Sequence, residues 1–181
     1  MGMPGSPLTV QRLVEDYYGS LYRYAFRLTG SSADAEDLTQ ETFCKAQLSF
    51  GQLREPARAK PWLFKILRTS FLHRVRADKQ HPCISLEGVG DLSAPVPESL
   101  PDIDPEQLQQ ALNELPEVYR TPIILFYFEE FSYRDVAEQM DLPIGTVMSR
   151  LARAKSFLRA RLLPPGDAVA AGAARRATDG L

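Results

Sequence analysis

A proline-rich break interrupts an otherwise helical sequence pattern and divides this chain in two. The segment HPCISLEGVGDLSAPVPESLPDIDP, residues 81–105, holds five prolines and two glycines, and its few apolar residues follow no period. Such a composition does not sustain a helix and is typical of a linker. We expect helical units over 10–79 and 106–163, an acidic flexible linker over 80–105, and a disordered tail over 164–181.

The N-terminal unit has the pattern of a helical bundle. Apolar residues recur at helical spacing over 13–28, and Gly30 marks the end of that helix. Ser31 or Ser32 is suited to cap a second helix, whose first turn is acidic as the helix dipole favours. Pro61 is suited to the first turn of a third helix. No alternating strand pattern of useful length is present, so the predicted fold class is all-α.

The C-terminal unit begins with leucines at helical spacing, and Pro116 then opens another helix. Pro122 lies inside that helix, and we expect it to kink or break the helix there. The last part of the unit, SYRDVAEQMDLPIGTVMSRLARAKSFLRARL, has the pattern of two short helices joined by a tight turn. Ser132 is a good N-cap for the first of these helices, and Asp141 begins the turn that follows it.

The second of these short helices is predicted to pack through Ile144, Val147 and Leu151. Its outer surface then carries hydroxyl and guanidinium groups, from Thr146, Ser149, Arg150 and Arg153. A helix-turn-helix motif places such positions in the major groove of DNA, where Arg bonds two acceptors of guanine. The alternative is an amphipathic helix with a solvated basic face. The turn chemistry, the small residue Ala137 where the helices cross, and the concentration of bases on one helix favour the helix-turn-helix.

The distribution of charge supports nucleic-acid binding more than the net charge of −2 does. Residues 1–79 carry 12 Lys/Arg against 8 Asp/Glu, residues 80–105 carry five acids and no base, and residues 106–163 carry 7 bases against 8 acids. In that last segment five bases follow one another from Arg150 to Arg161 with no acid between them. The average therefore conceals two basic surfaces and an acidic connector.

Several classes of function are disfavoured by the sequence. No nucleophile–base pair, glycine-rich phosphate loop or metal cluster is present, so we expect no catalytic residue, metal, cofactor or small-molecule substrate. Cys44 is predicted to be a small buried side chain, and His81 and Cys83 lack a second pair that would complete a zinc site. No apolar run is long enough to span a bilayer and no secretion signal is recognisable, so we expect a cytoplasmic protein.

Two stretches resemble one known family. LPEVYRTPIILFYFEEFSYRDVAEQMDLPIGTVMSRLARAKSFLRARL resembles region 4 of the extracytoplasmic-function (ECF) group of bacterial sigma factors. GSSADAEDLTQETFCKA with KPWLFKILRTSFLHRVR is similar to region 2 of the same group. The likeness covers roughly residues 10–79 and 106–163. It implies a transcription initiation factor that brings core RNA polymerase to promoters in a stress or envelope response.

The resemblance also implies roles for region 2. The polymerase contact, with the clamp helices of the β′ subunit, falls on the helix that carries Asp37, Leu38, Gln40 and Glu41. The loop 49–60 is expected to capture a flipped base of the −10 element, and Trp62 is expected to pack in the core first and to stack on DNA second. The residues expected at the opened −10 element are Arg54, Arg58, Lys60, Lys65, Arg68, Thr69, Arg74 and Arg76.

Region 4 is expected to bind the −35 element and the flap of the β subunit. Its predicted DNA contacts are Arg134, Thr146, Ser149, Arg150, Arg153 and Lys155. The chain departs from the common family pattern at Thr69 and His73, where relatives usually carry Asn and Asp, so its −10 preference is expected to differ. Met148 stands where relatives usually carry Lys, and the loss of one phosphate contact is expected to weaken −35 binding modestly and to lower its salt dependence. Relatives are held inactive by anti-sigma factors, and we expect one here.

Two alternatives stay open. One is a helix-turn-helix regulator that binds duplex DNA by itself and has no need of the region 2 loop. The other is a degenerate sigma paralogue that binds a partner without starting transcription, which the departures at Thr69 and Met148 keep open.

Overall fold

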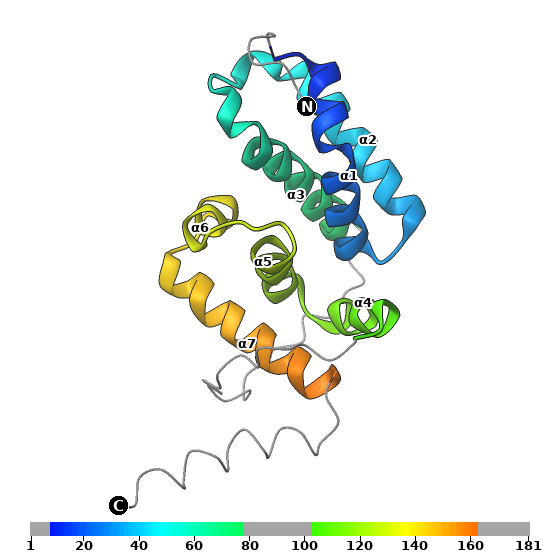
Figure 1. Cartoon of the computed structure of the whole chain (residues 1–181), viewed down its shortest axis with the longest axis vertical. Helices are drawn as coiled ribbons and strands as arrows, with labels where there is room; N and C mark the ends of the chain where they lie inside the picture. Colours follow the sequence, from blue (N-terminus) through cyan, green and yellow to red (C-terminus); the bar gives the residue numbers. More distant parts are fainter. Residues whose placement is uncertain (1–7, 78–102, 163–181) are drawn as a thin grey trace, which may run out of the picture. The chain divides into compact units, whose positions relative to one another are not determined.

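The computed structural model describes residues 8–77 and 103–162 (Figure 1). The chain divides into two compact units, residues 1–82 and 83–181. The described parts of both units are helical and contain no strand, so the fold is all-α as predicted. The expectations for most of the linker, for the tail, and for His81 and Cys83 fall outside the described residues.

The first unit is built on a three-helix core. It consists of α1 (Val10–Thr29), α2 (Ser32–Leu48), two short 3₁₀ helices, η1 (Phe50–Gln52) and η2 (Pro56–Arg58), and α3 (Ala59–Ala77). Helix α2 packs against both α1 and α3, and α1 also contacts α3. The rings of Tyr24 and Phe64 stack with centroids 4.9 Å apart and join α1 to α3 in the core.

The boundary between α1 and α2 follows from local chemistry. Gly30 has φ 72°, a left-handed conformation that costs glycine little, and its N–H donates to the carbonyl of Phe26. Ser31 then caps α2 by accepting from the N–H of Asp34. Both predictions are confirmed.

The prediction that Cys44 is buried is wrong, because its side chain is exposed on the outer side of α2.

The second unit contains four helices in its described part, α4 (Pro105–Glu114), α5 (Glu117–Tyr127), α6 (Tyr133–Met140) and α7 (Ile144–Leu162). Helix α7 packs against the other three. The residue before α4, Asp104, accepts a hydrogen bond from the N–H of Glu106, so the last residues of the expected linker form the start of a helix. We expected a kink or a break at Pro122; helix α5 continues through this buried residue, so the helix does not break there.

Packing explains why α5 remains a continuous helix although it contains Pro122. Proline removes one hydrogen bond of a helix interior and costs about 3 kcal/mol there. The five residues from Thr121 to Leu125 are all buried, and burial of apolar side chains is what holds most protein helices together.

No helix within the described residues has both the length and the apolar character that crossing a membrane requires.

Candidate polymerase and nucleic-acid interfaces

An ionic network joins α2 to α3 in the first unit. The Oε1 atom of Glu41 accepts from the ammonium of Lys45 at 2.6 Å, and its Oε2 atom accepts from Nη2 of Arg74 at 2.7 Å and from Nε at 3.1 Å. The Lys45 ammonium also donates to the hydroxyl of Ser70 at 2.8 Å. Partial burial by itself would raise the pKa of Glu41, but the Lys45 and Arg74 hydrogen bonds outweigh it and lower the pKa to about 2.

The rest of the expected polymerase contact on α2 separates into two groups. Asp37 and Gln40 are exposed and available to a partner. Leu38 is fully buried in the core, so its side chain supports α2 from within and does not face outward. Glu41 is half-buried and occupied by its two cations.

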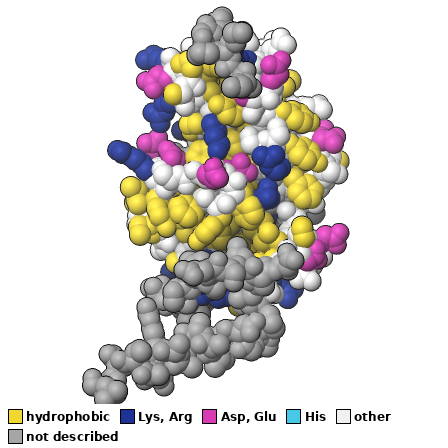
Figure 2. Space-filling view, in the orientation of Figure 1, with side chains coloured by type: hydrophobic (Ala, Val, Ile, Leu, Met, Phe, Trp, Pro, Cys, Tyr) yellow, Lys and Arg dark blue, Asp and Glu magenta, His cyan; other side chains and the backbone are white. Residues whose placement is uncertain are grey.

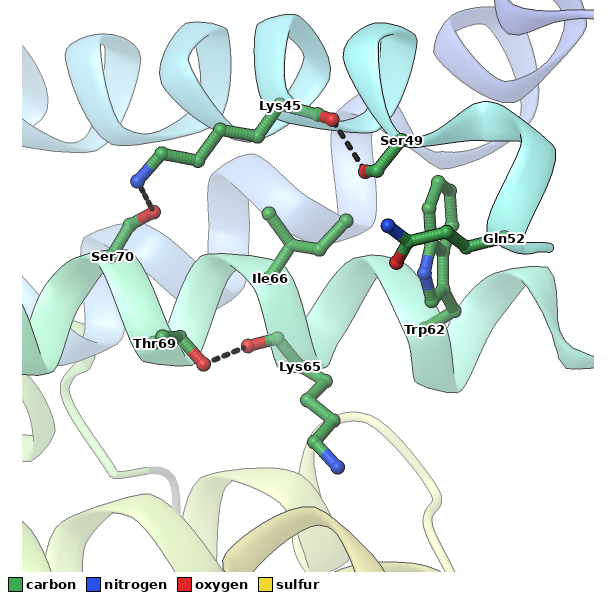
Figure 3. Close-up of a pocket in the computed structure, with 8 residues that line it drawn as sticks. All are labelled: Lys45, Ser49, Gln52, Trp62, Lys65, Ile66, Thr69 and Ser70. Carbon is green, nitrogen blue, oxygen red and sulfur yellow. Dashed lines mark hydrogen bonds between the residues drawn. The ribbon is translucent and has the colours of Figure 1, made fainter.

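A pocket of about 400 Å³ lies between the end of α2, η1 and α3 (Figure 3). Its lining combines an indole, an aliphatic wall, two ammonium groups and several hydrogen-bonding side chains, from Lys45, Ser49, Gln52, Trp62, Lys65, Ile66, Thr69 and Ser70. The Trp62 indole stands beside the Gln52 amide, and the Lys45 ammonium reaches Ser70 at the other end (Figure 3). Such a set can stack on a flat ring, hydrogen-bond its edge and attract a phosphate.

The structure gives Trp62 a different place from the core position that was expected first. Trp62 and Ile66 are only half-buried, and both line the pocket, while the core of α3 is formed by Leu63, Phe64 and Leu67. Three lining residues, Lys45, Ile66 and Ser70, were not expected at this site, and Ser49 and Gln52 were expected only as part of the loop 49–60. They come from three different elements, and only the fold brings them together.

Two of the eight expected −10 residues line this pocket. Lys65 and Thr69 line it, and the Thr69 hydroxyl donates to the carbonyl of Lys65 at 2.8 Å. Arg54 and Arg58 are exposed on the loop, Arg76 is exposed on α3, and Arg68 is half-buried. Lys60 lies over the ring of Phe64 at 5.8 Å from its centroid. Arg74 is held by Glu41, as described above.

The second unit contains a capped helix pair. The Ser132 hydroxyl accepts from the N–H of Asp135, and the Asp135 carboxylate accepts from the N–H of Ser132, so a full capping box starts α6. Asp141, with φ 55°, ends α6 in the left-handed conformation, and Pro143 precedes α7. Val136 and Val147 are fully buried where α6 and α7 pack. This is the geometry of a helix-turn-helix motif.

Most of the expected −35 residues lie on accessible surface. Ser149, Arg153 and Arg134 are exposed, and Thr146, Arg150 and Lys155 are half-buried. Arg153 donates to the hydroxyl of Tyr119 at 3.5 Å. Ile144 is 47% exposed, so the prediction that it packs against α6 is wrong. The face drawn in Figure 2 shows basic and acidic side chains scattered among exposed hydrophobic ones.

Two arginines connect α4 with other helices of the second unit. Arg161 near the C-terminus of α7 forms a bidentate ion pair with Glu114 of α4, with its closest N–O distance at 2.8 Å. Arg120 of α5 donates to the carbonyls of Asn113 and Leu115, which satisfies acceptors left over where α4 ends. Within the described part of the chain, no cluster of three His, Cys, Asp or Glu side chains forms a metal site.

Comparison with known proteins identifies the family. Residues 13–81 match the family model for Sigma-70 region 2, and residues 105–158 match that for Sigma-70, region 4. The ECF RNA polymerase sigma factor SigM of Bacillus subtilis is 31% identical over 156 residues, which cover 84% of this chain and 94% of SigM. The RNA polymerase sigma factor SigV of the same organism is 34% identical over 149 residues, which cover 82% and 88%.

A solved structure agrees with these sequence matches. The chain resembles the sigma factor RpoE from Bartonella quintana, which was crystallised with the anti-sigma factor NepR. The TM-score is 0.66 and the identity 29%, with 83% of this chain and 94% of that chain covered. The chain therefore belongs to the ECF RNA polymerase sigma factors.

Proposed function

We propose that this sigma factor directs core RNA polymerase to promoters by binding polymerase and opening the −10 element with its first unit while α7 reads the −35 element. The observation that carries this assignment is the pocket around Trp62 in a chain that also has a helix-turn-helix. A regulator that only binds duplex DNA needs the helix-turn-helix but does not need a pocket for an unpaired base.

The pocket is suited to one unpaired base of the separated strand. The Trp62 indole supplies a stacking surface, which is worth about 1–3 kcal/mol per base. Gln52 and Ser49 supply donors and acceptors for the edge of a base, and Lys45 and Lys65 supply charge for the adjoining phosphates. The arginines of the loop 49–60 and of α3 extend this surface along the strand.

The polymerase contact is assigned to the exposed face of α2. Asp37 and Gln40 present a carboxylate and an amide to the clamp helices of β′, and buried Leu38 holds the helix in place behind them. Glu41 acts chiefly through its ion pairs, which fix α2 against α3. The flap of the β subunit is assigned to the second unit.

The catalysis belongs to the polymerase, and this chain supplies recognition and strand opening in the cytoplasm. We assign an anti-sigma factor as its regulator because RpoE, which it resembles in fold and sequence, was crystallised with one. The response that this chain serves is assigned to stress or to the envelope, as the family resemblance implies.

A degenerate paralogue remains the second candidate. The observation that favours it is the Thr69 hydroxyl, which is turned back onto the carbonyl of Lys65. A paralogue that has lost its −10 preference would bind polymerase but start no transcript.

The test is in vitro transcription with sigma-free core polymerase and a pooled promoter library, with and without the protein. We expect transcripts from defined start sites only when the protein is present, and alignment of those starts gives both promoter elements. Binding to core polymerase without transcripts supports the degenerate paralogue. Absence of both activities contradicts the assignment of the first unit.

A further inference from the structure

Two large apolar side chains are exposed on the outer surface of α7. Ile144 is 47% exposed and Met148 is 52% exposed. They are four residues apart, so they lie next to each other on one face of the helix. The packing of α7 is provided by other residues, because Val147, Leu151 and Ala154 are buried. The exposed pair therefore does not take part in the packing of the described helices of the second unit.

The helix that carries this pair is basic, and the space beside the pair is open. No acid occurs between residues 142 and 162, while Arg150, Arg153 and Lys155 lie on the same helix. Gly145, beside the pair, has nothing within 4 Å of the position that a Cβ atom would take. An apolar pair on a helix whose charged residues are all basic fits a polyanion that also carries apolar groups. In the major groove of DNA the apolar group within reach is the C5-methyl of thymine.

We propose that Ile144 and Met148 read thymine methyl groups in the −35 element. The inference rests on the proposed assignment of α7 to that element. Residues four apart are separated by about 6 Å along a helix, and successive bases of a strand by about 3.4 Å. The two methyl groups therefore belong to thymines no more than about two base-pair steps apart. Arg150, Arg153 and Ser149 bind phosphates and hydrogen-bonding base edges around them.

Replacement of thymine by uracil tests this directly, because uracil lacks only the methyl group. The probe is a duplex promoter taken from the transcription selection, with uracil placed at one thymine of the −35 region at a time. Its binding to holoenzyme is measured for the full-length wild-type chain and for the Ile144→Ala and Met148→Ala variants. Leu48→Ala, which removes an 89% exposed apolar side chain from the first unit, is the matched control.

For the wild type and the Leu48→Ala control, we expect uracil at one or two neighbouring positions to weaken binding about fourfold per methyl group. Ile144→Ala or Met148→Ala should lose that sensitivity at its own position and keep it at the other. Equal sensitivity in all four proteins would overturn the inference, because other residues would then read the methyl groups. Weaker binding of the two variants to core polymerase, with uracil sensitivity unchanged, would also overturn it and assign the pair to a protein contact.

Two further outcomes separate this inference from the proposed function. If base-pair changes in the −35 region weaken binding but uracil does not, α7 reads the element without contacting methyl groups, and only the inference fails. If base-pair changes in the −35 region have no effect, the assignment of α7 to that element fails as well.

Discussion

Glu41 and Arg74 join two surfaces that the sequence assigns to different partners. Oε2 of Glu41 on α2 accepts two hydrogen bonds from the guanidinium of Arg74 on α3, at 2.7 and 3.1 Å. Glu41 belongs to the expected polymerase contact, and Arg74 to the expected −10 surface. The pair therefore fixes the helix assigned to polymerase against the helix assigned to DNA.

Removal of this acid should destabilise the first unit in a pH-dependent way. We expect Glu41→Gln to lower the free energy of unfolding by about 1–2 kcal/mol at pH 7, less than the full pKa shift implies because solvent screens these partly exposed groups. The folded pKa of about 2 lies below the ordinary value of 4.5. The stabilisation is therefore complete above pH 4.5 and is lost as the pH falls toward 2.

Denaturant unfolding of the wild type and Glu41→Gln at pH 7 and pH 3 measures this effect. The difference between the two proteins should shrink by more than half at pH 3. Glu36→Gln is the control, since Glu36 is an exposed acid of the same helix, and it should change stability little at either pH. A difference for Glu41→Gln that is the same at both pH values would contradict the ionic origin.

Trp62 should report directly on the pocket, because it is the only tryptophan of the chain. Titration of the free protein at low salt with a single-stranded oligonucleotide carrying the non-template −10 sequence should quench its fluorescence as a base stacks on the indole. Trp62→Ala should weaken binding of holoenzyme to a promoter with a pre-opened −10 region by about 10-fold or more, while Trp62→Phe retains most of it. If Trp62→Ala binds this promoter as tightly as the wild type, Trp62 does not stack on a base and serves only in packing.

The two pocket lysines should differ in their contribution to the salt dependence of binding. Lys45 is already paired with Glu41 at 2.6 Å, whereas Lys65 is exposed and its ammonium points away from the other pocket residues (Figure 3). Lys65→Gln should reduce the slope of log K against log salt by about 0.7 for single-stranded DNA. Lys45→Gln is the matched comparison and should reduce it by less than half as much.

If both variants reduce the slope of log K against log salt equally, the ion pair between Glu41 and Lys45 breaks when DNA binds. A larger change for Lys45→Gln than for Lys65→Gln would contradict the assignment of Lys65 to a phosphate. The measurement is a binding titration of holoenzyme with a pre-opened promoter at several salt concentrations.

Much of this fold could be predicted from the sequence because helix boundaries are set by neighbouring residues. The glycine at position 30, the serine cap at 31 and the capping box that starts at Ser132 each satisfy backbone groups within a few residues, so a short window of sequence contains the whole cause. The helix-turn-helix pattern was readable for the same reason. The family followed from motifs in both units.

Features that depend on distant residues were not readable in this way. The pocket takes its lining from α2, η1 and α3, and no local pattern indicates that Gln52 meets Trp62. The break expected at Pro122 overlooked the burial of α5. Ile144 was expected to pack because it is apolar, but it is the first residue of α7, and the buried stripe of that helix begins only at Val147.

Gly145 offers a test of how closely α7 approaches DNA. An added methyl group meets nothing within 4 Å in the free protein, and alanine is favoured over glycine in helices by about 0.5–1 kcal/mol. Gly145→Ala should therefore fold at least as stably as the wild type. If the backbone of α7 enters the major groove at this residue, the same methyl group should crowd the bases and weaken −35-dependent binding about tenfold. Gly19→Ala, the same change in α1, is the control and should leave DNA binding unchanged. If Gly145→Ala is as stable as the wild type and binds DNA normally, the backbone at residue 145 does not contact the bases. Longer side chains such as Arg153 would then make the contacts of α7 in the major groove.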